Sequence, residues 1–101
     1  MSPQDDYPTE RELQRIADWP VRDPAGLLDF IGNLWHFGDW GFKVRGKKVL
    51  RVELHTGGWS GNEEIIGCLE KTWLWYLSWE KSTRGGHYYL RVVPHLYACL
   101  T

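Results

Sequence analysis

The chain has 101 residues, which is enough for one hydrophobic core and too few for two, so a single domain is expected. Hydrophobic residues make up 43% of the sequence and charged residues 25%, a balance that excludes an intrinsically disordered chain. The formal net charge is −1. Residues 1–42 hold eight acidic and three basic residues, whereas residues 43–101 hold five acidic and nine basic ones. This split indicates either a polar binding surface or two halves that neutralise one another in the fold.

The sequence shows no sign of a membrane or secretory segment. No stretch reaches the roughly 18 consecutive apolar residues of a membrane helix, and the N-terminus lacks the apolar core of a signal peptide. Cys68 and Cys99 are far apart and belong to no CxxC pair, so both are expected to be reduced thiols. We therefore expect a protein of the cytoplasm that does not contact membranes.

Residues 1–8 are poor in apolar side chains and are predicted to be a disordered tail, followed by one domain over residues 9–101. Thr9 and Glu12 match a capping box, in which each side chain accepts a hydrogen bond from the other residue's backbone. Apolar residues at helical spacing follow, so the pattern predicts a short helix over residues 10–18.

A second helix is expected over residues 24–36. Asp23 is a residue type that caps helix N-termini, and Pro24 follows at the first helical position, where its missing N–H costs nothing. Apolar residues then recur at intervals of three and four, at Leu27, Leu28, Ile31, Leu34 and Trp35. This spacing predicts a helix with one face in the core.

After residue 39 the apolar residues alternate with polar ones. They occupy every second position at Trp40, Phe42 and Val44 and, after a turn at residues 46–48, at Leu50, Val52 and Leu54. The intervening positions include the basic residues Lys43, Arg45 and Arg51. The pattern predicts a β-hairpin with one apolar face and one basic face.

A glycine-rich loop, TGGWSGN, occupies residues 56–62. Its glycines suit neither a helix interior nor a strand, and they indicate backbone angles that other residues rarely adopt. Ser60 and Glu63 match a second capping box, so we expect a helix over residues 62–71.

The C-terminal part is predicted to form a second hairpin. Residues 72–81 alternate, with Trp73, Trp75, Leu77 and Trp79 on one side, and are predicted to be a strand. A turn over residues 82–86 and a partner strand over residues 87–93 follow, the latter stopped by Pro94. For residues 95–101 an edge strand and a docked tail are both compatible with the sequence.

The predicted fold is therefore α+β with the order ααββαββ. The two hairpins are expected to form one four-stranded antiparallel sheet, with the helices packed on one face. Of the seven tryptophans, we expect most in the core and one or two on the surface. Because so short a chain has limited interior, a homodimer is one expected way of covering them.

No motif of catalysis or metal binding is present. The glycine-rich loop lacks phosphate-binding spacing, and Glu63 and Glu64 after it would repel an anion. The histidines match no metal-ligand spacing, and there is no GxSxG elbow. We expect no cofactor, no metal and no enzymatic activity. The alternative is a small hydrolase or ligand-binding protein that uses four residues: His55, Trp59, Glu63 and His87.

Basic residues gather on both predicted hairpins. Interleaved with Trp40, Tyr88 or Tyr89, they suit a single-stranded nucleic acid, whose bases stack on rings while its phosphates contact cations. The basic residues are Lys43, Arg45, Lys47, Lys48 and Arg51 on the first hairpin and Lys81, Arg84 and Arg91 on the second. The sequence pI of about 6.4 is lower than expected of a dedicated nucleic-acid domain, and a merely solvated basic face is the other interpretation.

Three segments resemble small accessory proteins encoded by bacteriophages and prophages. They are HTGGWSGNEEII at residues 55–66, WLWYLSW at 73–79 and STRGGHYYLRV at 82–92. The resemblance implies a protein of the host cytoplasm that binds a host or phage protein. Inhibition of a bacterial defence system, such as a CRISPR effector, is one role of this kind. The resemblance brings no catalytic residues with it.

Our leading expectation is thus a phage-type accessory protein that acts by binding another protein, with nucleic-acid binding as the alternative. The expected binding residues lie in the two glycine-bearing loops and the first hairpin: Trp59, Asn62, Glu63, Arg84 and His87, with Lys43, Arg45 and Arg51.

Overall fold

The structure, a computed structural model, describes residues 8–36 and 38–97. In chain order its elements are α1 (Glu10–Asp18), α2 (Pro24–Leu34), α3 (Gly38–Gly41), β1 (Phe42–Arg45), β2 (Leu50–His55), α4 (Ser60–Leu69), α5 (Trp73–Ser78), β3 (Trp79–Thr83), β4 (His87–Val92) and α6 (Pro94–Tyr97). The predicted tail, apart from Pro8, lies outside the described residues, as do Cys99 and the end of the C-terminal segment. The part of that segment that is described forms α6.

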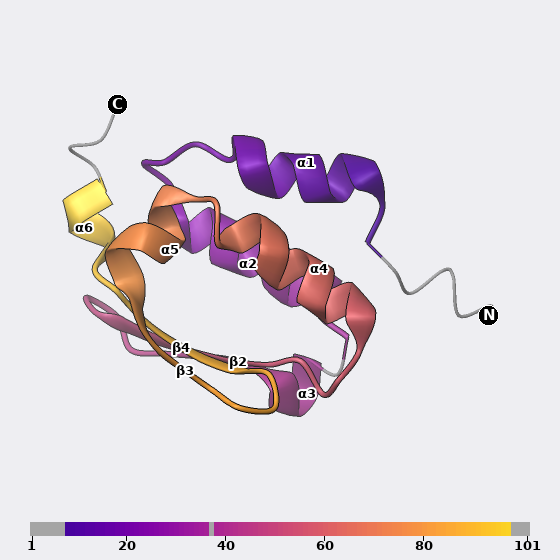
Figure 1. The fold of residues 1–101 in the computed structure, drawn as a ribbon. Helices are drawn as coiled ribbons and strands as arrows, with labels where there is room; N and C mark the ends of the chain where they lie inside the picture. Colours follow the sequence, from indigo (N-terminus) through magenta and orange to yellow (C-terminus); the bar gives the residue numbers. More distant parts are fainter. Residues whose placement is uncertain (1–7, 37, 98–101) are drawn as a thin grey trace.

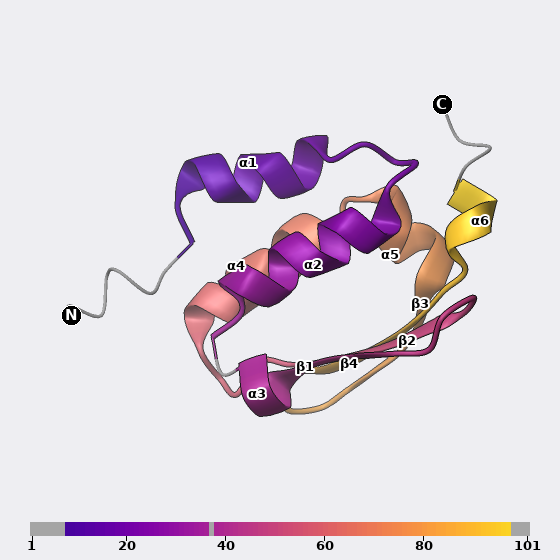
Figure 2. The same cartoon turned by 180° about the vertical axis from the view of Figure 1, so that it is seen from behind.

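Helices α1, α2, α4 and α5 lie on one face of a four-stranded antiparallel sheet, as the sequence predicts, and the short helix α3 lies at the end of the sheet (Figure 1). The strand order is β1-β2-β4-β3, so the two hairpins join through their inner strands, β2 and β4. Helices α2, α4 and α5 form the layer next to the sheet, and α1 lies over that layer on the side away from the sheet (Figure 2). The α+β fold and the predicted order of its main elements are confirmed.

The two N-terminal helices begin where the capping signals place them. Thr9 Oγ1 accepts a hydrogen bond from the Glu12 N–H at 3.1 Å, and Glu12 Oε1 accepts one from the Thr9 N–H at 2.9 Å. Asp23 Oδ1 accepts from the Gly26 N–H at 3.0 Å at the start of α2. That helix ends two residues before the predicted position, because Trp35 adopts an extended conformation.

The strand predicted over residues 72–81 is wrong, because its first part is the helix α5. Thr72 caps this helix: its Oγ1 accepts from the Trp75 N–H at 3.3 Å and donates to the Leu69 carbonyl oxygen at 2.7 Å. The two buried side chains, Leu74 and Ser78, are four residues apart, which is helical spacing. The tryptophan alternation is misleading because large apolar residues also occupy the exposed side of α5.

Two smaller predictions are also corrected. Trp40 belongs to the short helix α3 and not to the first strand, so β1 begins only at Phe42. The second capping box does not form, because α4 begins at Ser60 and its N-cap residue, Trp59, makes no side-chain capping hydrogen bond.

The core lies between the sheet and the helical layer. It is built from the inward side chains of β2 and β4 and from the facing sides of α2 and α4: Val52, Leu54, Leu90, Val92, Leu27, Leu28, Ile31, Ile65, Ile66 and Leu69. Only one tryptophan, Trp35, is fully buried, whereas Trp40, Trp73 and Trp79 are 49%, 53% and 48% exposed. The expectation of one or two surface tryptophans is therefore wrong. No described helix combines the length and the apolar character needed to cross a membrane.

Tyr97 in α6 supports a prediction about stability at alkaline pH. Its hydroxyl is buried and has no hydrogen-bond partner within the described residues. Burial raises the pKa of this phenol. The nearby Ser78 hydroxyl donates to the Leu74 carbonyl oxygen. Above pH of about 10 the unfolded chain releases this proton while the folded chain retains it, so the free energy of unfolding should fall as pH rises.

Tyr97→Phe should therefore raise the free energy of unfolding at neutral pH by about 1 kcal/mol, because a buried unpaired hydroxyl is removed. It should also reduce the alkaline fall, measured by urea unfolding at a series of pH values. The control is Tyr76→Phe, whose side chain is 78% exposed. An alkaline fall that is unchanged in Tyr97→Phe would contradict this assignment.

Candidate functional site

The face of the sheet opposite the helices carries the polar side chains of the strands, and we call it the outer face. Val52 and Leu54 of β2 are buried on the helical side, so Arg51, Glu53 and His55 point to the outer face. The same alternation applies to β1 and β4, and in β3 it is interrupted by an irregularity in the register between Trp79 and Lys81. In Figures 1 and 2, α1, α2, α4 and α5 all lie on the opposite side of the sheet.

The strand register arranges the outer face in three rows that run across the sheet. The first row is His55, His87 and Thr83; the second is Lys43, Glu53, Tyr89 and Lys81; the third is Arg45, Arg51 and Arg91. Successive rows are two residues apart along each strand, so they are separated by about 7 Å. The three rows thus hold five lysines and arginines against one carboxylate.

The third row places three arginines directly opposite one another on adjacent strands. Arg45 pairs with Arg51, which pairs in turn with Arg91. Like charges at directly paired positions are unfavourable by a few tenths to about 1 kcal/mol. None of the three forms an ion pair within the described residues. This row is therefore an unneutralised cationic line at one end of the outer face.

In the second row, the ring of Tyr89 is the central aromatic surface. The Lys81 ammonium lies 4.8 Å from its ring centroid, within the range of a cation–π interaction. The His55 ring meets the Tyr89 ring edge-on, with 5.9 Å between centroids. Tyr89 thus links the histidines of the first row to the lysines of the second.

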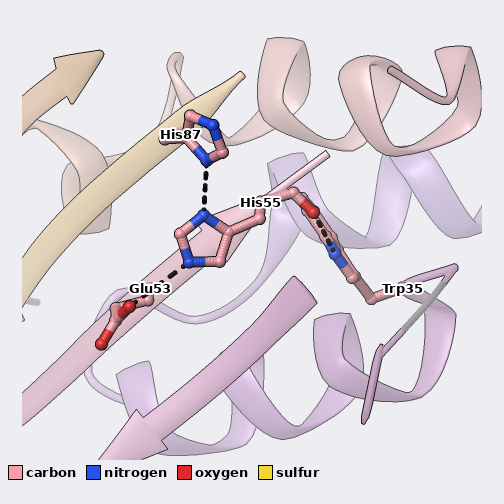
Figure 3. A network of polar contacts seen from close by, with 4 residues as sticks. All are labelled: Trp35, Glu53, His55 and His87. Atoms are coloured by element: carbon pink, nitrogen blue, oxygen red, sulfur yellow. Dashed lines mark hydrogen bonds and ion pairs between the residues drawn. The ribbon is translucent and has the colours of Figure 1, made fainter. Parts of the chain in front are cut away.

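The first row contains a chain of polar contacts through two histidines (Figure 3). His55 Nδ1 lies 2.7 Å from His87 Nδ1, and His55 Nε2 lies 3.3 Å from Glu53 Oε1. An ionised carboxylate only accepts hydrogen bonds, so His55 carries a proton on Nε2. In a neutral His55 ring the lone pair is then on Nδ1, and His87 donates to it from its own Nδ1. In this protonation state the chain of hydrogen bonds runs from His87 through His55 to Glu53.

The backbone of His55 is held from the helical side. The Trp35 indole N–H donates to the His55 carbonyl oxygen at 3.2 Å, as Figure 3 shows. Gly41 allows this approach, because a Cβ there would lie 2.7 Å from the same carbonyl oxygen. Since Trp35 is buried, the core itself fixes the end of β2 on which His55 stands.

Thr56, the next residue, joins the glycine-rich loop to the turn before β4. Its N–H donates to the Gly86 carbonyl oxygen at 3.0 Å, and its side chain is fully buried. A side chain at Gly86, where φ is +82°, would collide with the Thr56 hydroxyl. This Thr56–Gly86 junction therefore requires glycine, and it continues the pairing of His55 with His87.

Asn62 holds the glycine-rich loop from inside. Its Nδ2 donates to the carbonyl oxygens of His36 at 2.8 Å and Thr56 at 3.2 Å, and its Oδ1 accepts from the His36 N–H at 2.9 Å. Above it the rings of Trp59 and His36 stack with centroids 4.3 Å apart. Asn62 and Trp59 thus make contacts within the chain, and Asn62 is fully buried.

The structure places only some of the binding residues expected from the sequence on the outer face. It brings together Lys43, Arg45, Arg51 and His87 on the outer face. Arg84 lies exposed in the β3–β4 turn, whereas Glu63 lies on α4, on the helical side of the sheet. From the sequence, Arg91 and Tyr89 are identified only as basic and aromatic residues of the second hairpin, and Glu53 is not assigned to this surface. Only the pairing of β2 with β4 brings these three residues onto one surface, and neither hairpin by itself indicates that pairing.

Other features of the surface lie away from the outer face. A depression of about 720 Å³ is lined by α1 and the α1–α2 connection and shares no residue with the three rows.

On the inner face of the sheet, burial raises the pKa of Tyr88, and the carboxylates of Glu70 and Glu63 raise it to a smaller extent. Within residues 8–36 and 38–97, no three His, Cys, Asp or Glu side chains are grouped as metal ligands.

Comparison with protein-family models, with curated proteins and with solved structures finds no match to this chain. The resemblance to bacteriophage accessory proteins therefore stays a prediction.

Asn62→Ala tests the role of the buried amide. It should lower the free energy of unfolding by about 2 to 3 kcal/mol, because backbone groups of His36 and Thr56 lose their buried partner. Urea unfolding measures this change. Glu64→Ala, an exposed change two residues further along α4, should alter stability by less than about 0.5 kcal/mol. Equal effects of both changes would contradict the proposed role of Asn62.

Arg51→Gln tests the repulsion in the arginine row. At low ionic strength it should raise the free energy of unfolding by about 0.5 kcal/mol, because the central charge of the row is removed. The difference should shrink as salt screens the charges. Lys48→Gln in the β1–β2 turn, which is not paired across strands, is the matched control. A loss of stability in Arg51→Gln at low salt would show that the row is not repulsive.

Proposed function

We propose that this protein binds a nucleic-acid strand on the outer face of its sheet. The single observation that carries the proposal is the row of Arg45, Arg51 and Arg91, three directly paired cations without an ion-pair partner among the described residues. Lys43 and Lys81 extend the positive surface along the next row.

A polyanion is the ligand that this arrangement favours. In the free protein the three arginines repel one another, and phosphates bound along the row would reduce this repulsion. The guanidinium group matches a phosphate with two parallel hydrogen bonds, and release of the counterions around the nucleic acid adds to the affinity. One small anion would not span the face, because about 13 Å separates the arginine row from the histidine row.

A single strand fits better than a duplex. Tyr89 and the two histidine rings offer π surfaces between the cations, and unpaired bases stack on such rings. Lys81 covers Tyr89 in the free protein and would turn toward a phosphate when a base takes its place. A rigid duplex exposes backbone and groove edges but not the flat faces of its bases.

The net charge of −1 does not oppose this proposal, because the charges are separated in space. Acidic residues of the first part of the chain lie on the helical side, on α1 and α2: Glu10, Glu12, Asp18 and Asp29. Helix α1 is the layer furthest from the sheet (Figure 1). The uneven charge along the sequence therefore becomes an acidic side and a basic side of one molecule.

The expectation of a protein partner, in a phage accessory protein or defence inhibitor, stays a prediction, as does a homodimer. The observation that favours it is on α5, where Trp73, Tyr76 and Leu77 expose large apolar side chains beside Trp79 of β3. This aromatic surface is separate from the three rows of the outer face, so variants of the two surfaces distinguish the two functions.

Binding should be measured with a fluorescent single-stranded oligoribonucleotide of about ten nucleotides, by anisotropy at a series of salt concentrations. The affinity should fall with salt, with a logarithmic slope of about −0.7 for each phosphate contacted. Arg51→Gln and Arg91→Gln should each weaken binding about tenfold, the equivalent of one charged hydrogen bond, and make the slope shallower by about 0.7.

Arg11→Gln on α1 is the matched control, since it removes the same charge from the helical side. It should leave the affinity unchanged. The proposal fails when the oligoribonucleotide does not bind at low salt, or when Arg11→Gln weakens binding as much as Arg51→Gln. Binding of an acidic protein by the outer face, without binding of the oligoribonucleotide, would favour the protein-partner expectation instead.

A further inference from the structure

We infer that the chain of Glu53, His55 and His87 cleaves a bound RNA strand by transferring a backbone phosphate to the neighbouring 2′-oxygen. This inference rests on the proposed function, since the strand must lie on the outer face. It departs from the expectation of a protein without enzymatic activity. Its basis is the contact geometry of the first row and the cations beside it.

Cleavage of this kind needs one group that accepts a proton and another that donates one, close to the same phosphate. Glu53 holds the proton of a neutral His55 on Nε2, so the lone pair is on Nδ1, which faces His87 Nδ1 and is the proton acceptor. His87 Nδ1, 2.7 Å away, holds the proton that can be donated. In the free protein His87, the proton donor, is hydrogen-bonded directly to His55, the proton acceptor.

The contact is not needed to hold the two strands together. The backbone ladder already pairs β2 with β4 from Leu50–Val92 to His55–His87, and the Thr56–Gly86 junction extends it by one step. Both rings are on the outer face, away from the core. A linked carboxylate and two imidazoles at that place, beside cations, therefore suit proton transfer on a ligand better than structural support.

The reaction balances without a further reactant. His55 Nδ1 takes the proton of the RNA 2′-hydroxyl, whose oxygen forms a bond to the adjacent phosphorus. The bond between phosphorus and the 5′-oxygen of the next nucleotide breaks. His87, which must carry a proton on both ring nitrogens for this step, gives its Nδ1 proton to that leaving oxygen and becomes a neutral imidazole. The products are one fragment with a 2′,3′-cyclic phosphate and one with a 5′-hydroxyl. One proton is taken up and one is released.

The scissile phosphate must enter between the two imidazoles, so the rings have to part. The phosphate oxygens would then replace the direct contact between the Nδ1 atoms. His87 follows two glycines of positive φ, Gly85 and Gly86, and a Cβ at Gly85 would lie 3.3 Å from His87 Nε2. The absence of a side chain at Gly85 leaves room beside the His87 ring.

The second row supplies the charge that this step requires. The transferred phosphate gains negative charge as it is attacked, and cations close to it stabilise that charge. Lys43 and Lys81 stand one row away from the histidines, about 7 Å along the strands, within reach of their long side chains. The arginine row would hold the phosphates further along the strand. Glu53 is a positioning residue, because it acts on the RNA only through His55.

The test uses the whole protein and an end-labelled single-stranded oligoribonucleotide of about ten nucleotides, in EDTA, with fragments resolved by electrophoresis and mass spectrometry. The expected result is cleavage to fragments with a 2′,3′-cyclic phosphate and a 5′-hydroxyl. A DNA strand of the same sequence should bind and stay intact, because it has no 2′-hydroxyl.

His55→Ala and His87→Ala should each lower the cleavage rate by at least about 100-fold while RNA binding is kept. His55→Gln and His87→Gln are second variants, used when an alanine variant does not fold. Glu53→Gln should keep binding and change the pH profile of the cleavage rate, which a purely structural role of Glu53 would leave unaltered. The control His95→Ala, exposed on α6, should cleave as the unchanged protein does.

The outcomes separate this inference from the proposed function. RNA that binds to the outer face and stays intact over the whole pH range overturns the inference and leaves the proposed function standing. Cleavage that persists in the histidine variants also overturns it, because the activity then belongs to other residues or to a contaminating nuclease. Failure of the RNA to bind at low salt overturns both.

Discussion

The polar outer face of the sheet depends on how the sheet ends at the Thr56–Gly86 junction. There the buried Thr56 side chain packs against Gly86, and a side chain at position 86 would collide with the Thr56 hydroxyl. Asn62 ties the same threonine carbonyl to the backbone of His36, so the loop, the helical layer and the turn before β4 are fixed together. The register of β2 against β4 follows from this closure, and a slip by one residue would turn every outer side chain inward.

The register has an electrostatic consequence. It aligns three arginines at one end of the outer face and two histidines at the other, with lysines between. An arrangement of this kind lowers stability, since paired like charges repel one another. The core of β2, β4, α2 and α4 side chains offsets that cost. Ligand-binding sites commonly contain residues that lower the stability of the free protein, and the arginine row fits that description.

Local signals in the sequence predict much of this fold and little of the surface. Capping residues such as Thr9 and Asp23 place the first helices because the hydrogen bonds involved span only three residues. Residues 73–78 are mispredicted because tryptophans on an exposed helix face imitate the alternation of a strand. The outer face depends on contacts between residues more than thirty positions apart, such as His55 with His87, and no local pattern encodes that pairing.

The glycine segments therefore serve the backbone and the surface at once. In sequence terms, each segment requires glycine only because its backbone adopts positive φ angles. Four glycines have such angles: Gly57, Gly58, Gly85 and Gly86. These angles, however, bring β2 to its end and start β4 at the one position where His55 and His87 face each other. A structural reason for the glycines is thus also the condition for the histidine contact. Replacing Gly86 would disturb the fold and the candidate site through the same collision.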